Sequence, residues 1–176
     1  MKKLAAVSLL LALVVPAQAD DSADLTAAAN RFYATYAALP RSGGLPGPAA
    51  RARLAPLLSA RLNGLIGDAA RADARFHAKV KDSPPLFEGD LFSSLFEGFR
   101  SYKVGACSAS GSAGRCTMQL HYQDPGQKPA DWNDEVLFTK AKDGWKVDDI
   151  AYKAGFAFGN TGLASQTLKM VISTVP

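Results

Sequence analysis

The chain has 176 residues, of which 48% are hydrophobic and 20% are charged, and its formal net charge at pH 7 is +4. Two of the basic residues, Lys2 and Lys3, lie at the N-terminus, so residues 20–176 carry 18 Lys and Arg against 16 Asp and Glu. This near balance excludes the strongly basic surface that nucleic-acid binding requires. No cofactor motif is present, and two cysteines and two histidines are too few for an obvious metal site, so we expect neither a cofactor nor a metal.

The first nineteen residues have the three parts of a secretory signal peptide. A positive end at Lys2 and Lys3 precedes an apolar run over 4–15 and a small-x-small site at 17–19. The apolar run is too short to span a bilayer as a helix, and no cysteine follows that could carry a lipid anchor. We expect cleavage after Ala19, which leaves 157 residues, enough for one domain, in a periplasmic or secreted protein without a membrane span.

Helical spacing dominates the next segment of the chain. Ser22 is placed to cap a helix that extends to about residue 39, with Leu25, Ala29, Phe32 and Tyr36 on one face. Prolines and glycines over 39–48 predict a loop, either a binding loop or lid or a simple connector.

Two further helices are expected before the Pro84-Pro85 pair. The first is short and covers 49–57, and Ser59 is placed to cap the second, longer one. The apolar stripe of the longer helix contains Leu62, Leu65, Ile66, Ala69, Phe76 and Val80. Arg71, Arg75 and Lys79 form a basic strip on its other side, which is either a solvated face or a surface for anionic lipid or an acidic partner.

Strand patterns follow residue 99. Four segments separated by turn signals predict an antiparallel meander: 100–107, 115–123, 133–140 and 145–153. In the second segment, Met118, Leu120 and Tyr122 alternate with polar residues, so we expect one packed face and one wetter face. Asn160 or Thr161 is placed to cap a last helix, although the alternative that this segment forms a strand stays open.

The two cysteines, Cys107 and Cys116, flank a segment of small residues, 108–115, that predicts a flexible loop. In an oxidising compartment, this arrangement favours a disulfide across a hairpin. Closing a ten-residue loop would restrict the unfolded chain by roughly 2.5–3 kcal/mol. A redox-active pair would need the Cys-x-x-Cys spacing, which is missing.

Three segments of the chain form a recognisable set: 85–94 (PLFEGDLFSS), 132–136 (WNDEV) and 145–152 (WKVDDIAY). They resemble landmarks of a family of secreted and lipoprotein bacterial domains of unknown function. The resemblance implies an envelope location and the nuclear transport factor 2-like, or cystatin-like, cone fold, and it implies no activity or site residues. With the order of the predicted elements, we expect an α+β domain over 20–176, in which N-terminal helices pack on a curved four-stranded antiparallel sheet that wraps around the longest of them.

Asp148 and Asp149, near the end of the last predicted strand, are the first candidates for chemistry. Alternation directs one of them inward and one outward unless a bulge intervenes. An inward carboxylate beside Tyr152 or Tyr122 could act as a general base, as in isomerases and dehydratases of the superfamily. The alternative is structural, with both aspartates paired to an arginine or to backbone amides.

A second candidate site precedes the first predicted strand. Glu88 and Asp90 lie among four phenylalanines that could line an apolar pocket with a polar lip: Phe87, Phe92, Phe96 and Phe99. The alternative is a connection whose phenylalanines close the open end of the sheet.

Three classes of function stay open. The lack of a convergent nucleophile, base and metal ligands favours our first expectation, a non-catalytic envelope protein that binds a protein partner. The alternatives are a carrier or sensor of a small apolar ligand inside the fold, and an isomerase, dehydratase or hydrolase that uses a pocket carboxylate. A homodimer is supported only by analogy with the fold.

Overall fold

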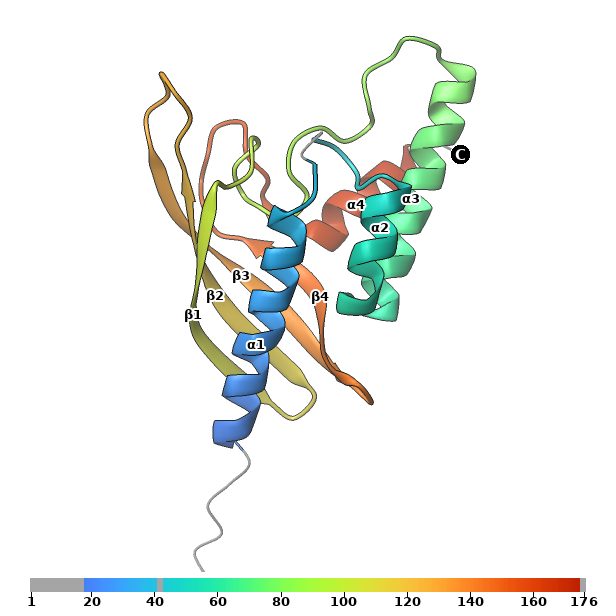
Figure 1. Ribbon diagram of the computed structural model, residues 1–176. Helices are drawn as coiled ribbons and strands as arrows, with labels where there is room; N and C mark the ends of the chain where they lie inside the picture. The colour runs from blue at the N-terminus through green and yellow to red at the C-terminus, as the bar shows by residue number, and fades with distance from the viewer. Residues whose placement is uncertain (1–17, 41–42, 175–176) are drawn as a thin grey trace, which may run out of the picture.

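The computed structural model describes residues 18–40 and 43–174, and its architecture is α+β (Figure 1). Three helices and a one-turn helix precede the sheet, and one helix follows it. The helices are α1 (Gln18–Ala37), α2 (Pro48–Leu54), the 3-10 turn η1 (Ala55–Leu57), α3 (Ala60–Lys79) and α4 (Ala164–Ser173). Residues 1–17, the greater part of the predicted signal peptide, lie outside the described residues.

The sheet is an antiparallel meander in which every strand pairs with its neighbours in the chain. Its strands are β1 (Ser101–Ser110), β2 (Ala113–Tyr122), β3 (Ala130–Ala141), β4 (Gly144–Tyr152) and β5 (Gly162–Leu163). The alternation predicted for β2 is confirmed, because Met118, Leu120 and Tyr122 are all buried. The expected number of four strands was wrong: β5 is too short for any periodic pattern, and its pairing with β4 adds the fifth strand.

The disulfide between Cys107 and Cys116 is confirmed, but the loop predicted between them was wrong. The two cysteines pair directly across β1 and β2, and both strands continue past them. Gly111 and Ser112 alone form the turn, with Gly111 at a φ of 59°, a conformation that glycine adopts without strain. Small residues carry a weak strand signal, and pairing with the neighbouring strand overrides it here.

The helix against the sheet is α1, and not the later helix that we expected (Figure 1). Its predicted apolar face is confirmed at Leu25, Ala29 and Phe32, which are fully buried. Gly114 of β2 permits this close packing, since a Cβ there would lie 2.5 Å from Leu25 Cδ2. The predicted cap at Ser22 was wrong: this residue lies within α1, and its hydroxyl donates to the carbonyl of Cys107 at 3.1 Å.

The remaining helices pack together beside β4. Ser59 caps α3 as predicted, because its Oγ accepts the backbone N–H of Leu62 at 3.0 Å. The apolar stripe of α3 is buried only as far as Ala72, while Phe76 is half-buried and Val80 is 46% exposed, so the core ends before the predicted stripe does.

The last helix starts later than we predicted. Neither Asn160 nor Thr161 caps α4, which begins at Ala164. The backbone N–H of Leu163 instead donates to the side chain of Gln166 at 3.0 Å, which satisfies one donor at the start of the helix.

Candidate functional site

A β-bulge places Asp148 beside the start of α3. The register of β3 against β4 shifts between Val147 and Asp149, so that Asp148 is the extra residue. Its carboxylate accepts hydrogen bonds from Ser59 Oγ at 2.5 Å and from Arg61 Nη2 at 2.8 Å. Partial burial raises the pKa of Asp148, but the hydrogen bonds from Arg61 and Ser59 outweigh this effect and hold the pKa below its ordinary value.

Asp149 is buried, and both of its carboxylate oxygens have partners. Oδ1 accepts the backbone N–H of Ser165 at 2.9 Å and that of Ile150 at 3.0 Å, and Oδ2 lies 3.3 Å from Arg61 Nη2. Ser165 is in the first turn of α4, where a carboxylate stabilises the helix end. The geometry therefore matches the structural interpretation of Asp148 and Asp149, with an arginine and backbone amides as partners.

The hydroxyls of the two candidate tyrosines form hydrogen bonds with groups other than these aspartates. The hydroxyl of Tyr152 is buried and donates to the carbonyl of Leu91 at 2.7 Å, and burial raises the pKa of Tyr152 well above its ordinary value. The hydroxyl of Tyr122 donates to Asp124 Oδ2 at 3.0 Å, and the guanidinium of Arg100 lies 5.0 Å from the centre of its ring. Both hydroxyls thus have fixed partners, and the proposed acid–base pairs are not assembled.

The structure does not bring the residues of the second candidate site together at one surface. Glu88 is exposed, whereas Asp90 is buried and its Oδ1 accepts the backbone N–H of Phe92 at 2.8 Å. Three of the four phenylalanines belong to the core, and only Phe96, which is 43% exposed, reaches the surface.

Asp134 of β3 lies at the centre of a network that sequence reasoning missed. It is fully buried, and its Oδ2 accepts the backbone N–H of Ser94 at 2.7 Å and the indole N–H of Trp132 at 3.1 Å. Its Oδ1 accepts the backbone N–H of Lys153 at 2.9 Å and the hydroxyl of Ser94. One carboxylate therefore joins the connection before β1 to the segment that follows β4.

Asn160 makes a second link between the same two segments. Its side-chain amide donates to the carbonyls of Asp90 and Ser93, each at 2.7 Å, and its backbone N–H donates to the carbonyl of Ser94 at 2.8 Å. The two segments are thus held side by side by buried and half-buried hydrogen bonds.

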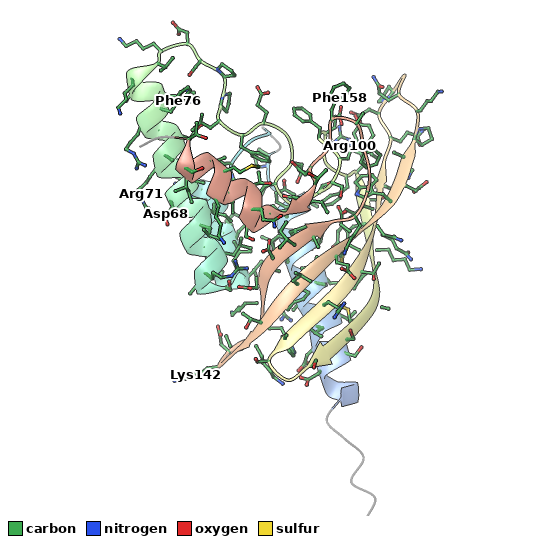
Figure 2. The ribbon with its side chains drawn as sticks, turned by 180° about the vertical axis from the view of Figure 1, so that it is seen from behind. Asp68, Arg71, Phe76, Arg100, Lys142 and Phe158 are labelled. Atoms are coloured by element: carbon green, nitrogen blue, oxygen red, sulfur yellow. A yellow bond between two sulfur atoms is a disulfide. The ribbon has the colours of Figure 1, made fainter. Side chains whose placement is uncertain are left out.

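An apolar cleft of about 530 Å³ lies between the tips of these segments, and we call it the phenylalanine cleft. Its lining residues are Leu95, Phe96, Glu97, Phe156, Ala157, Phe158 and Gly159. Phe158 is 90% exposed and lies at the end of the molecule opposite Lys142 (Figure 2). Phe156 is anchored by an edge-on contact with Trp132, with ring centres 5.4 Å apart. Large apolar side chains gathered at a concave surface are typical of a binding site.

One feature of the sequence could have indicated the network. Asp134 occupies an inward position of β3, between Trp132 and Val136, which are both buried. A carboxylate at such a position needs several donors, because burying an unpaired charge costs several kcal/mol. Phe158, by contrast, is an isolated residue in a loop and belongs to no pattern.

Comparison of the chain with protein-family models, with characterised proteins and with solved structures found no match in any of the three. In the described parts of the chain, no helix is long and apolar enough to cross a membrane. Over the same residues, no group of three or more His, Cys, Asp or Glu side chains is placed to hold a metal ion.

Proposed function

We propose that this protein is an exported, non-catalytic binding protein of the bacterial envelope, with a nuclear transport factor 2-like fold, and that the phenylalanine cleft is where it binds a protein partner. Export is supported by the signal-peptide pattern of residues 1–19 and by the disulfide, which suits an oxidising compartment. The fold assignment is supported by the order of elements, with α1 against an antiparallel sheet.

The exposure of Phe158 beside a preformed cleft is the observation that carries the proposal. Its ring is 90% exposed, although burying such a side chain would contribute about 2–3 kcal/mol. The hydrogen bonds of Asp134 and Asn160 hold the loops in place before any partner arrives. A rigid site loses little conformational entropy on binding, so more of the apolar burial is available as affinity.

The chemistry of the lining points to the kind of partner. Within the described residues, Glu97 is the charged side chain among those that line the cleft, and the other lining residues are apolar or glycine. An apolar side chain flanked by Lys or Arg, on an exposed segment of another protein, complements this surface. A site at the surface is also favoured because the space between α1 and the sheet is filled by aromatic side chains such as Phe32, Tyr33 and Phe99.

Photo-crosslinking in intact cells tests the proposal. A photoreactive phenylalanine analogue replaces Phe158 in one strain and Met170 of α4, which is 64% exposed, in a control strain. We expect a discrete crosslinked protein from position 158 that is absent from position 170 and is lost when Phe96→Ser is added. Equal crosslinking from both positions, or none from position 158, would exclude the cleft as the binding site.

A further inference from the structure

The apolar stripe of α3 extends beyond the core that it helps to form. The last residue of α3 in the core is Ala72, and the helix continues for two more turns, which project past α4 (Figure 1). Phe76 lies in the last turn of α3, and Val80 is the residue that follows the helix, with its backbone N–H donating to the carbonyl of Phe76 at 2.8 Å. Phe76 is half-buried and Val80 is 46% exposed, and neither is part of the core.

Positive charge is concentrated in the same part of the chain. Residues 48–81 contain seven Lys and Arg but only two Asp, whereas the rest of residues 20–176 contains 11 Lys and Arg against 14 Asp and Glu. Arg61 and Arg71 are neutralised by aspartates. Arg75, Lys79 and Lys81 are exposed, and no ion pair to them is found in the part of the chain that the structure describes.

The acidic groups nearby do not cancel this charge. The carboxylate of Asp73 accepts the backbone N–H of Leu86 at 2.8 Å and lies 3.6 Å from His77 Nε2. Asp82 is exposed beside Lys81 and offsets one of the three positive charges. The end of α3 and the residues that follow it therefore combine a half-buried Phe76 and an exposed Val80 with a net positive charge.

We infer that the α3 tip, which consists of Arg75, Phe76, Lys79, Val80 and Lys81, docks on an anionic phospholipid bilayer. Phe76 and Val80 would enter the boundary between head groups and acyl chains, and the basic side chains would meet the lipid phosphates. Two apolar side chains are far too few for a stable protein interface, which buries about 1,200–2,000 Å². A second copy would also bring like charges together, so charge complementarity favours the anionic surface.

This site is separate from the phenylalanine cleft. Phe76 lies on α3 and Phe158 on the loop between β4 and β5, and Figure 2 shows them apart from each other at the end of the molecule opposite Lys142. The inference does not depend on the proposed function of the cleft, and the two can fail independently.

Vesicle co-sedimentation tests the inference. The exported protein is mixed with vesicles of phosphatidylcholine, with or without a quarter of phosphatidylglycerol, at low and at physiological salt. We expect binding only to the anionic vesicles, and weaker binding at higher salt. The double variant Lys79→Gln with Lys81→Gln should bind the anionic vesicles at least about ten-fold more weakly, because each basic residue near an anionic surface raises the affinity about five-fold. Val80→Ser should weaken binding without changing its salt dependence.

Two matched variants serve as controls. All variants have the same N-terminal residues, so any contribution of these residues to vesicle binding is the same in each. Lys142→Gln removes an exposed positive charge at the opposite end of the molecule, and Phe158→Ser removes the more exposed apolar ring (Figure 2). Both should bind the anionic vesicles like the parent protein. Equal binding to neutral vesicles, or the same loss in Lys142→Gln or Phe158→Ser, would overturn the inference. Self-association that Val80→Ser abolishes, without vesicle binding, would also overturn it and assign the tip to a second copy.

Discussion

Asp134 joins three segments that are distant in the sequence. It accepts hydrogen bonds from Ser94, which precedes the sheet, from Trp132 on its own strand, and from Lys153, which follows β4. The carboxylate replaces the water that these donors would otherwise bind, so the network is stabilising only while it is complete. Together with Asn160, this buried side chain holds the segments that line the cleft.

Removing this carboxylate should strongly destabilise the protein. Asp134→Ala leaves three N–H donors without their acceptor, and we expect the free energy of unfolding to fall by about 3 kcal/mol or more. Urea-induced unfolding measures the change. Glu135→Ala is the matched control, since Glu135 pairs with the exposed Lys153 at 3.0 Å and should contribute less than about 1 kcal/mol. Equal effects of the two variants would show that Asp134 is not the anchor that we describe.

The ion pair of Asp148 with Arg61 should make stability depend on acid pH. Because folding lowers the pKa of Asp148, its contribution is present above the unfolded pKa of about 3.9 and is lost as the pH falls through the lower folded value. Arg61→Gln should therefore lower the free energy of unfolding by about 1 kcal/mol at pH 7, a small value because the arginine is half-exposed to solvent. The loss should become progressively smaller below about pH 4.

Unfolding curves of the parent protein and of Arg61→Gln between pH 7 and about pH 3 measure how the difference between their free energies of unfolding shrinks as the pH falls. Arg71→Gln serves as the control, because its ion pair with Asp68 is largely solvent-exposed and should have little effect at any pH. A constant difference between the parent and Arg61→Gln across the range would contradict the assignment of Asp148 as the titrating group.

The contact between α1 and β2 depends on the absence of a side chain at Gly114. A methyl group there would meet Leu25 Cδ2 at 2.5 Å and Leu25 Cδ1 at 2.9 Å. We expect Gly114→Ala to destabilise the protein by about 1–3 kcal/mol through overpacking, as measured by thermal unfolding.

Gly64 on α3 provides the opposite case. A Cβ there would meet nothing within 4 Å, and the residue lies inside a helix. Gly64→Ala should therefore raise stability by about 0.5–1 kcal/mol, because alanine lowers the conformational entropy of the unfolded chain. The same sign of change for both glycines would contradict the close packing of α1 on β2.

At this scale, much of the fold could be predicted from local patterns. Ser59 caps α3, and Met118 and Leu120 face the core, because capping and alternation depend on adjacent residues. The loop predicted around Gly111 was wrong because the residues before it pair with β2, and those after it pair with both β1 and β3, which small side chains alone do not indicate.

The candidate site was less predictable because long-range contacts create it. Periodicity placed Phe76 and Val80 on the apolar stripe, but it could not show where neighbouring elements end and the core stops. Similarly, Asp148 and Asp149 are adjacent carboxylates that suggest chemistry, and only the fold shows that Arg61 binds both. The disulfide was predictable because two cysteines in a chain that is expected to be exported allow one pairing.

On the scale of the whole molecule, the two proposed surfaces lie on different elements at the same end (Figure 2). The phenylalanine cleft lies between the loops that precede β1 and follow β4, and the α3 tip lies at the free end of a projecting helix. Basic residues gather in the helices around the tip, while residues outside 48–81 carry an excess of acidic groups. A protein with this layout can rest on an anionic membrane through the α3 tip and hold a partner in the cleft close to that membrane.

The affinity of the crosslinked partner for purified variants tests the central claim most directly. If the partner's apolar side chain fills the cleft, Phe158→Ser should raise the dissociation constant about 30-fold, which corresponds to a loss of about 2 kcal/mol. Met170→Ser, an exposed apolar change on α4, should leave it unchanged. The same dissociation constant for the parent protein and Phe158→Ser would contradict the account.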